Sequence, residues 1–137
     1  MADTSGARAA GAALVFDADV WEQEVGRFEA GSRTRAIAER ARRELERSGV
    51  GGRHFQRCAA EGDDGTRLGS CLKLHVPLDR PGSEAPYGFV FQLGVDDGPP
   101  RRVELSLLAF GDRHPKPGTR SVYERAHTRL YRRYPDE

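Results

Sequence analysis

The sequence predicts a small α+β domain in which two N-terminal helices pack on a small antiparallel sheet and a basic helix ends the chain. Three observations predict this fold. Apolar residues recur at helical spacing in two early segments, they alternate with period two in three later segments, and basic residues gather near the C-terminus. The chain has 137 residues, 37% hydrophobic and 31% charged, which is typical of one soluble domain. We place this domain at residues 13–134, after a flexible segment at residues 1–12.

The N-terminal third of the domain predicts a short strand and two helices. Residues 13–16 (ALVF) form the short first strand, and residues 19–22 (DVWE) form a capping box at the start of the first helix. Gly31 ends that helix, Ser32 caps the second, and the second runs to about Arg47 before Gly49. The apolar faces consist of Trp21, Val25 and Phe28 in the first helix and of Ile37, Ala38, Ala41 and Leu45 in the second.

Three strands follow a segment at residues 49–69 that predicts a loop with at most one turn of structure. They are residues 71–76, 87–93 and 102–110, and the turn-forming stretches between them predict an antiparallel meander. Alternation in the first strand places Cys71, Lys73 and His75 on one face, opposite Leu72, Leu74 and Val76. In the third strand, Val103, Leu105, Leu107 and Ala109 are expected to point inward.

The C-terminal helix begins at a second capping box, residues 121–124 (SVYE), and carries a narrow apolar stripe of Val122, Ala126 and Leu130. We expect it to pack on the same face of the sheet as the other helices. Between Arg113 and Arg133 there are seven basic residues and a single acid, whereas the whole chain has a net charge of only +1. Such a patch is typical of a surface that binds an anion, commonly nucleic acid, although a solvated helix face has the same composition.

Composition argues against several other classes of protein. Cys58 and Cys71 are too few for a disulfide framework and lack the neighbouring Cys or His residues of a zinc site, so we expect reduced thiols and no metal. Apolar runs are too short to span a membrane, and the first residues lack the apolar core of a secretory signal. We therefore expect a cytoplasmic protein without a small-molecule cofactor.

Three short sequence words, in this order, resemble the RelE/ParE toxin superfamily. They are LGSCLK at residues 68–73, YGFVF at residues 87–91, and FGDRH at residues 110–114 followed by Tyr123. The resemblance covers the order of elements over roughly residues 13–133. It implies a RelE-like toxin of a bacterial type II toxin–antitoxin system, which inhibits translation by cutting messenger RNA without a metal. The implied partners are a cognate antitoxin and RNA or the ribosome.

The resemblance also implies roles for individual residues. Lys73 and Arg113 would hold the phosphate, because fixed cations stabilise the charge that develops on phosphorane oxygens. His75 or His114 would move a proton, and Tyr123 would stack on a base or orient a hydroxyl. Each side chain also has a simpler interpretation, as solvated surface or, for Tyr123, as a packed ring. Residues expected to contact RNA are Arg67, Lys116, Arg120, Arg125 and Arg129.

The chain departs from the family at one position. The family word "yR" places an arginine after the strand tyrosine, and this chain has Gly88 after Tyr87. A glycine cannot place a charge on a phosphate, so Arg67 or Arg120 would have to substitute. Gly88 therefore favours a second hypothesis, an inactive RelE-like binding module for an antitoxin, RNA or another protein. A third is a ParE-like inhibitor of a DNA topoisomerase, which shares the fold without the nuclease residues.

Overall fold

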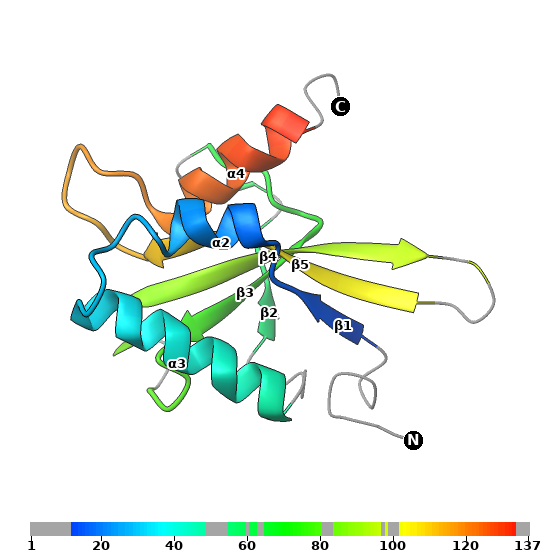
Figure 1. Cartoon of the computed structure of the whole chain (residues 1–137). Coiled ribbons are helices and arrows are strands. Elements are labelled where there is room, and N and C mark those ends of the chain that lie inside the picture. The colour runs from blue at the N-terminus through cyan, green and yellow to red at the C-terminus, as the bar shows by residue number, and fades with distance from the viewer. Residues whose placement is uncertain are drawn as a thin grey trace.

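The computed structural model describes residues 12–48, 55–59, 61–62, 65–80, 84–96, 98 and 102–133. Most of the expected N-terminal segment, Gly49 and the end of the predicted domain lie outside these residues. The helices and strands appear in Figure 1 and are, in chain order, β1 (Ala12–Val15), α2 (Ala18–Glu24), α3 (Arg33–Ser48), β2 (Phe55–Arg57), β3 (Cys71–Val76), β4 (Tyr87–Asp96), β5 (Arg102–Asp112) and α4 (Val122–Arg133). No helix in the described residues is long and apolar enough to cross a membrane.

One five-stranded sheet organises the fold, with the strand order β1-β5-β4-β3-β2. β3, β4 and β5 form the predicted antiparallel meander, and β1 pairs in parallel with β5 from Ala12 opposite Val103 to Val15 opposite Ser106. β2 pairs antiparallel with β3 at the other edge, in a segment that we predicted as loop. Its three residues, Phe-Gln-Arg, are too few to show a period, so pairing with β3 determines this strand.

The predicted helix caps are confirmed at α3 and α4 and wrong at α2. Ser121 Oγ accepts a hydrogen bond from the backbone N–H of Glu124 at 3.1 Å, and the Glu124 carboxylate accepts one from Ser121 N–H at 2.8 Å. Ser32 Oγ accepts from the N–H of Arg35 at 3.3 Å. α2 instead begins after Asp17, whose carboxylate accepts from two backbone N–H groups, and it ends at Glu24, well before Gly31. The apolar spacing that we assigned to a longer helix thus continues into a turn.

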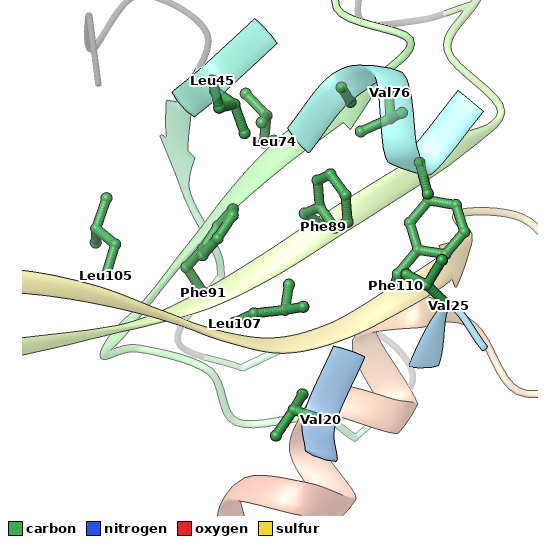
Figure 2. Packing of buried hydrophobic residues seen from close by; sticks show 12 residues of the cluster. Val20, Val25, Leu45, Leu74, Val76, Phe89, Phe91, Leu105, Leu107 and Phe110 are labelled. Carbon is green, nitrogen blue, oxygen red and sulfur yellow. The ribbon is translucent and has the colours of Figure 1, made fainter. Parts of the chain in front are cut away.

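The larger apolar cluster lies on the face of the sheet that α3 covers. Phe89, Phe91 and Phe110 are fully buried there, with ring centroids 5.9 Å apart for Phe89–Phe91 and 5.2 Å apart for Phe89–Phe110 (Figure 2). Full burial of one such side chain stabilises the fold by about 1.5–3 kcal/mol relative to leaving it exposed. Facing them from α3 are Ala38, Ala41 and Leu45.

A second apolar cluster lies on the opposite face, beneath α4. Val90 and Leu108 from the strands meet Val122, Ala126 and Leu130 of the helix. The expectation that every helix packs on one face is therefore wrong for α4, which Figure 1 shows across the sheet from α3. The central strands carry apolar residues on both faces, so a helix has to pack on each face to shield these residues from water.

A β-bulge places apolar residues of β5 on both faces. Val90 pairs with Ala109, but the next residue, Phe91, pairs with Leu107, so Leu108 is an extra residue on β5. As a result Leu107 belongs to the cluster under α3, whereas Leu108 and Ala109 belong to the cluster under α4. Ala109 is buried as predicted, but on the other face from Leu105 and Leu107, because a strict period of two cannot anticipate a bulge.

Candidate functional site

A cleft of about 680 Å³ lies beside the first turn of α4, and we call it the α4 cleft. Its walls come from β3, from the loop that follows β2, from the segment between β5 and α4, and from α4 itself. Four residues predicted from the sequence line it, namely Lys73, Arg113, His114 and Tyr123, and so does Lys116. His75 and the other predicted RNA contacts do not line it. The remaining lining residues are Cys58, Ala59, Gly62, Thr66, Leu68, Pro115, Pro117, Thr119, Ser121 and Glu124.

The Arg113 side chain is held in place at the end of β5. Its Nη1 donates to the carbonyl oxygen of Ala85 at 2.8 Å, and its Nε donates to the hydroxyl of Tyr123 at 3.3 Å. The backbone N–H of Arg113 also donates to the carbonyl of Pro86 at 2.9 Å. The guanidinium therefore has a defined position at the cleft wall, which lowers the entropy cost of placing it on an anion.

Tyr123 lies between two cations. Arg113 contacts its hydroxyl, and the ammonium nitrogen of Lys73 lies 5.6 Å from the centroid of its ring. The negative face of an aromatic ring attracts a cation at this distance. Lys73 on β3 and Arg113 after β5 are thus brought to one tyrosine of α4, although 40 residues of sequence separate the two cations.

Gly88 is where this cluster meets the sheet. It pairs with Gly111 across β4 and β5. A Cβ atom at position 88 would lie 3.4 Å from Cγ of Arg113 and 3.6 Å from Cγ1 of Val122. The aliphatic part of Arg113 therefore occupies the space above Gly88. The cation that the family resemblance places on this strand is absent, but another cation, from the end of the neighbouring strand, passes over the same position.

His75 lies next to these cations on β3 but outside the cleft lining. Its Nε2 is buried and has no hydrogen-bond partner among the described residues. Burial lowers the pKa of His75 below its ordinary value, and the positive charges of Arg113, Lys73 and His114 lower it further. A neutral imidazole such as that of His75 can accept a proton. The other predicted histidine, His114, is exposed and lines the cleft.

The two cysteines lie opposite each other beneath the cleft. The backbone N–H of Cys58 donates to the carbonyl of Cys71 at 3.1 Å, and both thiols are buried and unbridged. Burial raises the pKa of Cys58 to about 12, with a contribution from the neighbouring Cys71, and it raises the pKa of Cys71 to about 11. Neither thiol is therefore a nucleophile at neutral pH.

Two of the predicted RNA contacts on α4 bind a buried carboxylate that sequence reasoning missed. Arg125 donates to Glu24 from Nε at 2.9 Å and from Nη2 at 2.8 Å, and Arg129 Nη2 donates to the same carboxylate at 2.8 Å. The side chain of Glu24 is only 2% exposed. Burial alone would raise its pKa, but the hydrogen bonds from Arg125, Arg129 and the N–H of Phe110 hold the pKa below its ordinary value.

The other predicted RNA contacts lie on both flanks of α4. The backbone N–H of Arg67 donates to Nδ1 of His127 at 3.0 Å, and the Arg67 guanidinium lies 5.5 Å from the ring centroid of Tyr131. Arg120 Nη1 donates to the hydroxyl of Thr128 at 3.3 Å. Arg67 and Arg120 thus contact residues of α4, and Arg113, which we had assigned to phosphate binding, is the cation beside Gly88.

Comparison with known proteins adds no information on function. No family model matches the sequence, and neither the curated proteins nor the solved structures give a match. Within the described residues, no three His, Cys, Asp or Glu side chains are grouped so that they can hold a metal ion. What the α4 cleft does offer is one arginine held by hydrogen bonds and two lysines, beside a tyrosine and an exposed histidine.

Proposed function

We propose that this protein is a RelE-like toxin that cuts messenger RNA at the α4 cleft by a metal-independent mechanism. The observation that carries the proposal is the convergence of Lys73, Arg113, His114 and Tyr123 on one cleft. These residues were predicted from three separate parts of the sequence, and both cations contact the same tyrosine. The order of elements, with two helices before an antiparallel meander and a basic helix after it, also supports the proposal.

The chemistry requires cations on the phosphate, a base and an acid, and the α4 cleft supplies the cations and one histidine. The ribose 2′-oxygen attacks its own phosphorus, and the bond from phosphorus to the 5′-oxygen of the next nucleotide breaks. The products are a 2′,3′-cyclic phosphate and a 5′-hydroxyl. Lys73 and Arg113 stabilise the negative charge on the phosphorane oxygens. A histidine accepts the 2′ proton, and a second proton must reach the leaving 5′-oxygen.

His114 is the better candidate for proton transfer, because it lines the cleft and is exposed. His75 is the alternative. It is held neutral by burial and by neighbouring positive charge, but its buried Nε2 would need the sheet surface to open before it reached a substrate. Separate replacement of each histidine therefore tests which of them transfers the proton.

The nuclease test uses purified protein, RNA and EDTA, with and without ribosomes. The wild type should release fragments that end in 2′,3′-cyclic phosphate. Arg113→Ala and Lys73→Ala should each cut at least about 100-fold more slowly, because each variant lacks one of the two cations that stabilise the charged intermediate. Arg43→Ala, on the exposed side of α3, is the matched control and should cut at the wild-type rate. Intact RNA in every wild-type reaction would exclude the nuclease.

A binding module is the second candidate, and one observation favours it. The Arg113 guanidinium already donates to Ala85 and Tyr123, and Arg125 and Arg129 bind Glu24, so much of the positive charge has partners within the protein. Induced expression in a bacterial host without a cognate antitoxin separates the candidates. Translation arrest by the wild type and not by Arg113→Ala supports the toxin, and normal growth with abundant folded protein supports the binding module.

A further inference from the structure

A second, smaller hollow lies on the other flank of α4, between that helix and α2. It has a volume of about 250 Å³, and we call it the α2–α4 hollow. Unlike the α4 cleft, it is lined almost entirely by polar and charged groups. Four of its lining residues are arginines and only one is an acid. The lining consists of Gln23, Glu24, Arg120, Arg125, Thr128, Arg129 and Arg132.

Glu24 forms the floor of this hollow and fixes two of the arginines. Its carboxylate accepts hydrogen bonds from Nε and Nη2 of Arg125 and from Nη2 of Arg129. Arg129 is held further, because Nε donates to the carbonyl of Leu108 and Nη1 to the side chain of Gln23, each at 2.8 Å. The side chains of Arg125 and Arg129 are still 27% and 17% exposed. Their guanidinium groups therefore face the hollow in fixed orientations.

The charge of the hollow remains strongly positive after Glu24 is counted. One carboxylate cannot neutralise four guanidinium groups, and within the described residues neither Arg120 nor Arg132 forms a salt bridge. Arg120 donates to Thr128 at 3.3 Å, which holds it over the hollow. Rigid, positively charged guanidinium groups around a small polar space are the arrangement that binds phosphate in proteins.

We infer that the α2–α4 hollow binds a phosphate group. Resting on the proposed function, we assign it to a second phosphate of the RNA strand that is cut in the α4 cleft. The segment at residues 119–121 separates the two sites, since Thr119 and Ser121 line the cleft whereas Arg120 lines the hollow. A strand that crosses this segment presents one phosphate to each side of α4.

The first test asks whether the hollow binds phosphate without any RNA. Inorganic phosphate, added at constant ionic strength in place of chloride, should raise the melting temperature of the wild type. In the double variant Arg120→Gln/Arg132→Gln this increase should be clearly smaller, and what remains is due to phosphate bound by Lys73 and Arg113 in the α4 cleft. Arg43→Gln/Arg47→Gln, which removes the same charge from the exposed side of α3, should retain it. No increase in the wild type, or an increase of the same size in Arg120→Gln/Arg132→Gln, would overturn the inference.

The second test uses RNA that cannot be cut, with every 2′-hydroxyl methylated. Arg120→Gln/Arg132→Gln should weaken binding of a hexanucleotide at least about tenfold. The slope of log K against log salt concentration should also become shallower by about 0.7, the value for one phosphate contact on a single strand. Binding of a dinucleotide, which has a single bridging phosphate for the cleft, should be unchanged. Equal losses for both lengths would contradict a separate phosphate site.

The two proposals can fail separately. Phosphate binding that depends on Arg120 and Arg132 in a protein that never cuts RNA would support the hollow and reject the nuclease. RNA cleavage by a protein whose phosphate binding is unaffected in Arg120→Gln/Arg132→Gln would support the nuclease and reject the hollow.

Discussion

The carboxylate of Glu24 accepts a hydrogen bond from the backbone N–H of Phe110 at 3.1 Å, 86 residues along the chain. β1 pairs with β5 only as far as Ser106, so Phe110 lies beyond that ladder on the same edge of the sheet. There the Glu24 carboxylate accepts the backbone hydrogen bond that a carbonyl group of a neighbouring strand would otherwise accept. Because the same carboxylate also binds Arg125 and Arg129, it joins α2, β5 and α4.

Glu24→Gln should destabilise the fold by about 3 kcal/mol, because removing one partner of a buried ion pair leaves the other charges uncompensated. Urea unfolding followed by circular dichroism at about pH 7 measures the change. Glu22→Gln is the matched control, since Glu22 is an exposed acid on the same helix, and it should change the free energy of unfolding by less than about 0.5 kcal/mol. Similar values for both variants would show that Glu24 does not stabilise the fold.

The contribution of Glu24 should depend on pH in a defined direction. Its pKa in the folded protein is lower than in the unfolded chain, so its stabilising effect is complete above the ordinary glutamate pKa of about 4.3. That effect is lost as the pH falls from this value through the lower folded pKa. The difference in unfolding free energy between wild type and Glu24→Gln should therefore be constant near neutrality and shrink in acid. A difference that grows in acid would contradict the lowered pKa.

Gly88 should tolerate a methyl group but not an arginine. The contacts of 3.4 Å and 3.6 Å that a Cβ atom would make are ordinary, so Gly88→Ala should stay within about 1 kcal/mol of the wild type. Gly88→Arg has to displace Arg113 and the start of α4, and should cost about 1–3 kcal/mol. Thermal unfolding of both variants checks this, and an unchanged Gly88→Arg would show that the space above the strand is open.

The cysteines should react slowly with iodoacetamide in the folded protein. With pKa values of about 12 and about 11, Cys58 and Cys71 are almost entirely protonated at about pH 8. Labelling should be at least roughly 100-fold slower than for an unstructured thiol, as followed by intact mass. Concentrated guanidinium should restore the rate expected for a peptide. Rapid labelling of the native protein would show that the thiols are exposed or that their pKa values are low.

Sequence patterns predicted the strands with clear alternation and the helices with clear capping signals. They did not predict β2, which depends on pairing with β3, or the bulge at Leu108, which moves Ala109 to the other face. They also placed α4 on the wrong face, because a strand that is apolar on both sides does not reveal which helix covers which side.

The same limit applies to the candidate site. Lys73, Arg113, His114 and Tyr123 were predicted from short words in the sequence, and they line one cleft. Glu24 was missed because its partners lie about a hundred residues away, and nothing in its own helix distinguishes it from an exposed acid. The sequence therefore suggested only RNA as a partner of Arg125 and Arg129, whereas in the structure both side chains donate hydrogen bonds to the Glu24 carboxylate.

The outer edge of β5 has a consequence for association. An exposed strand edge is a template on which another chain can extend the sheet. Beyond β1, Leu108 O accepts from Arg129, Phe110 N–H donates to Glu24, and Phe110 O accepts from Arg27, so charged side chains already occupy this edge. A second chain could add a strand there only by displacing these side chains. Protonation of Glu24 would weaken one of these three contacts, so acid is the condition under which this edge is least protected against sheet extension by another copy of the protein.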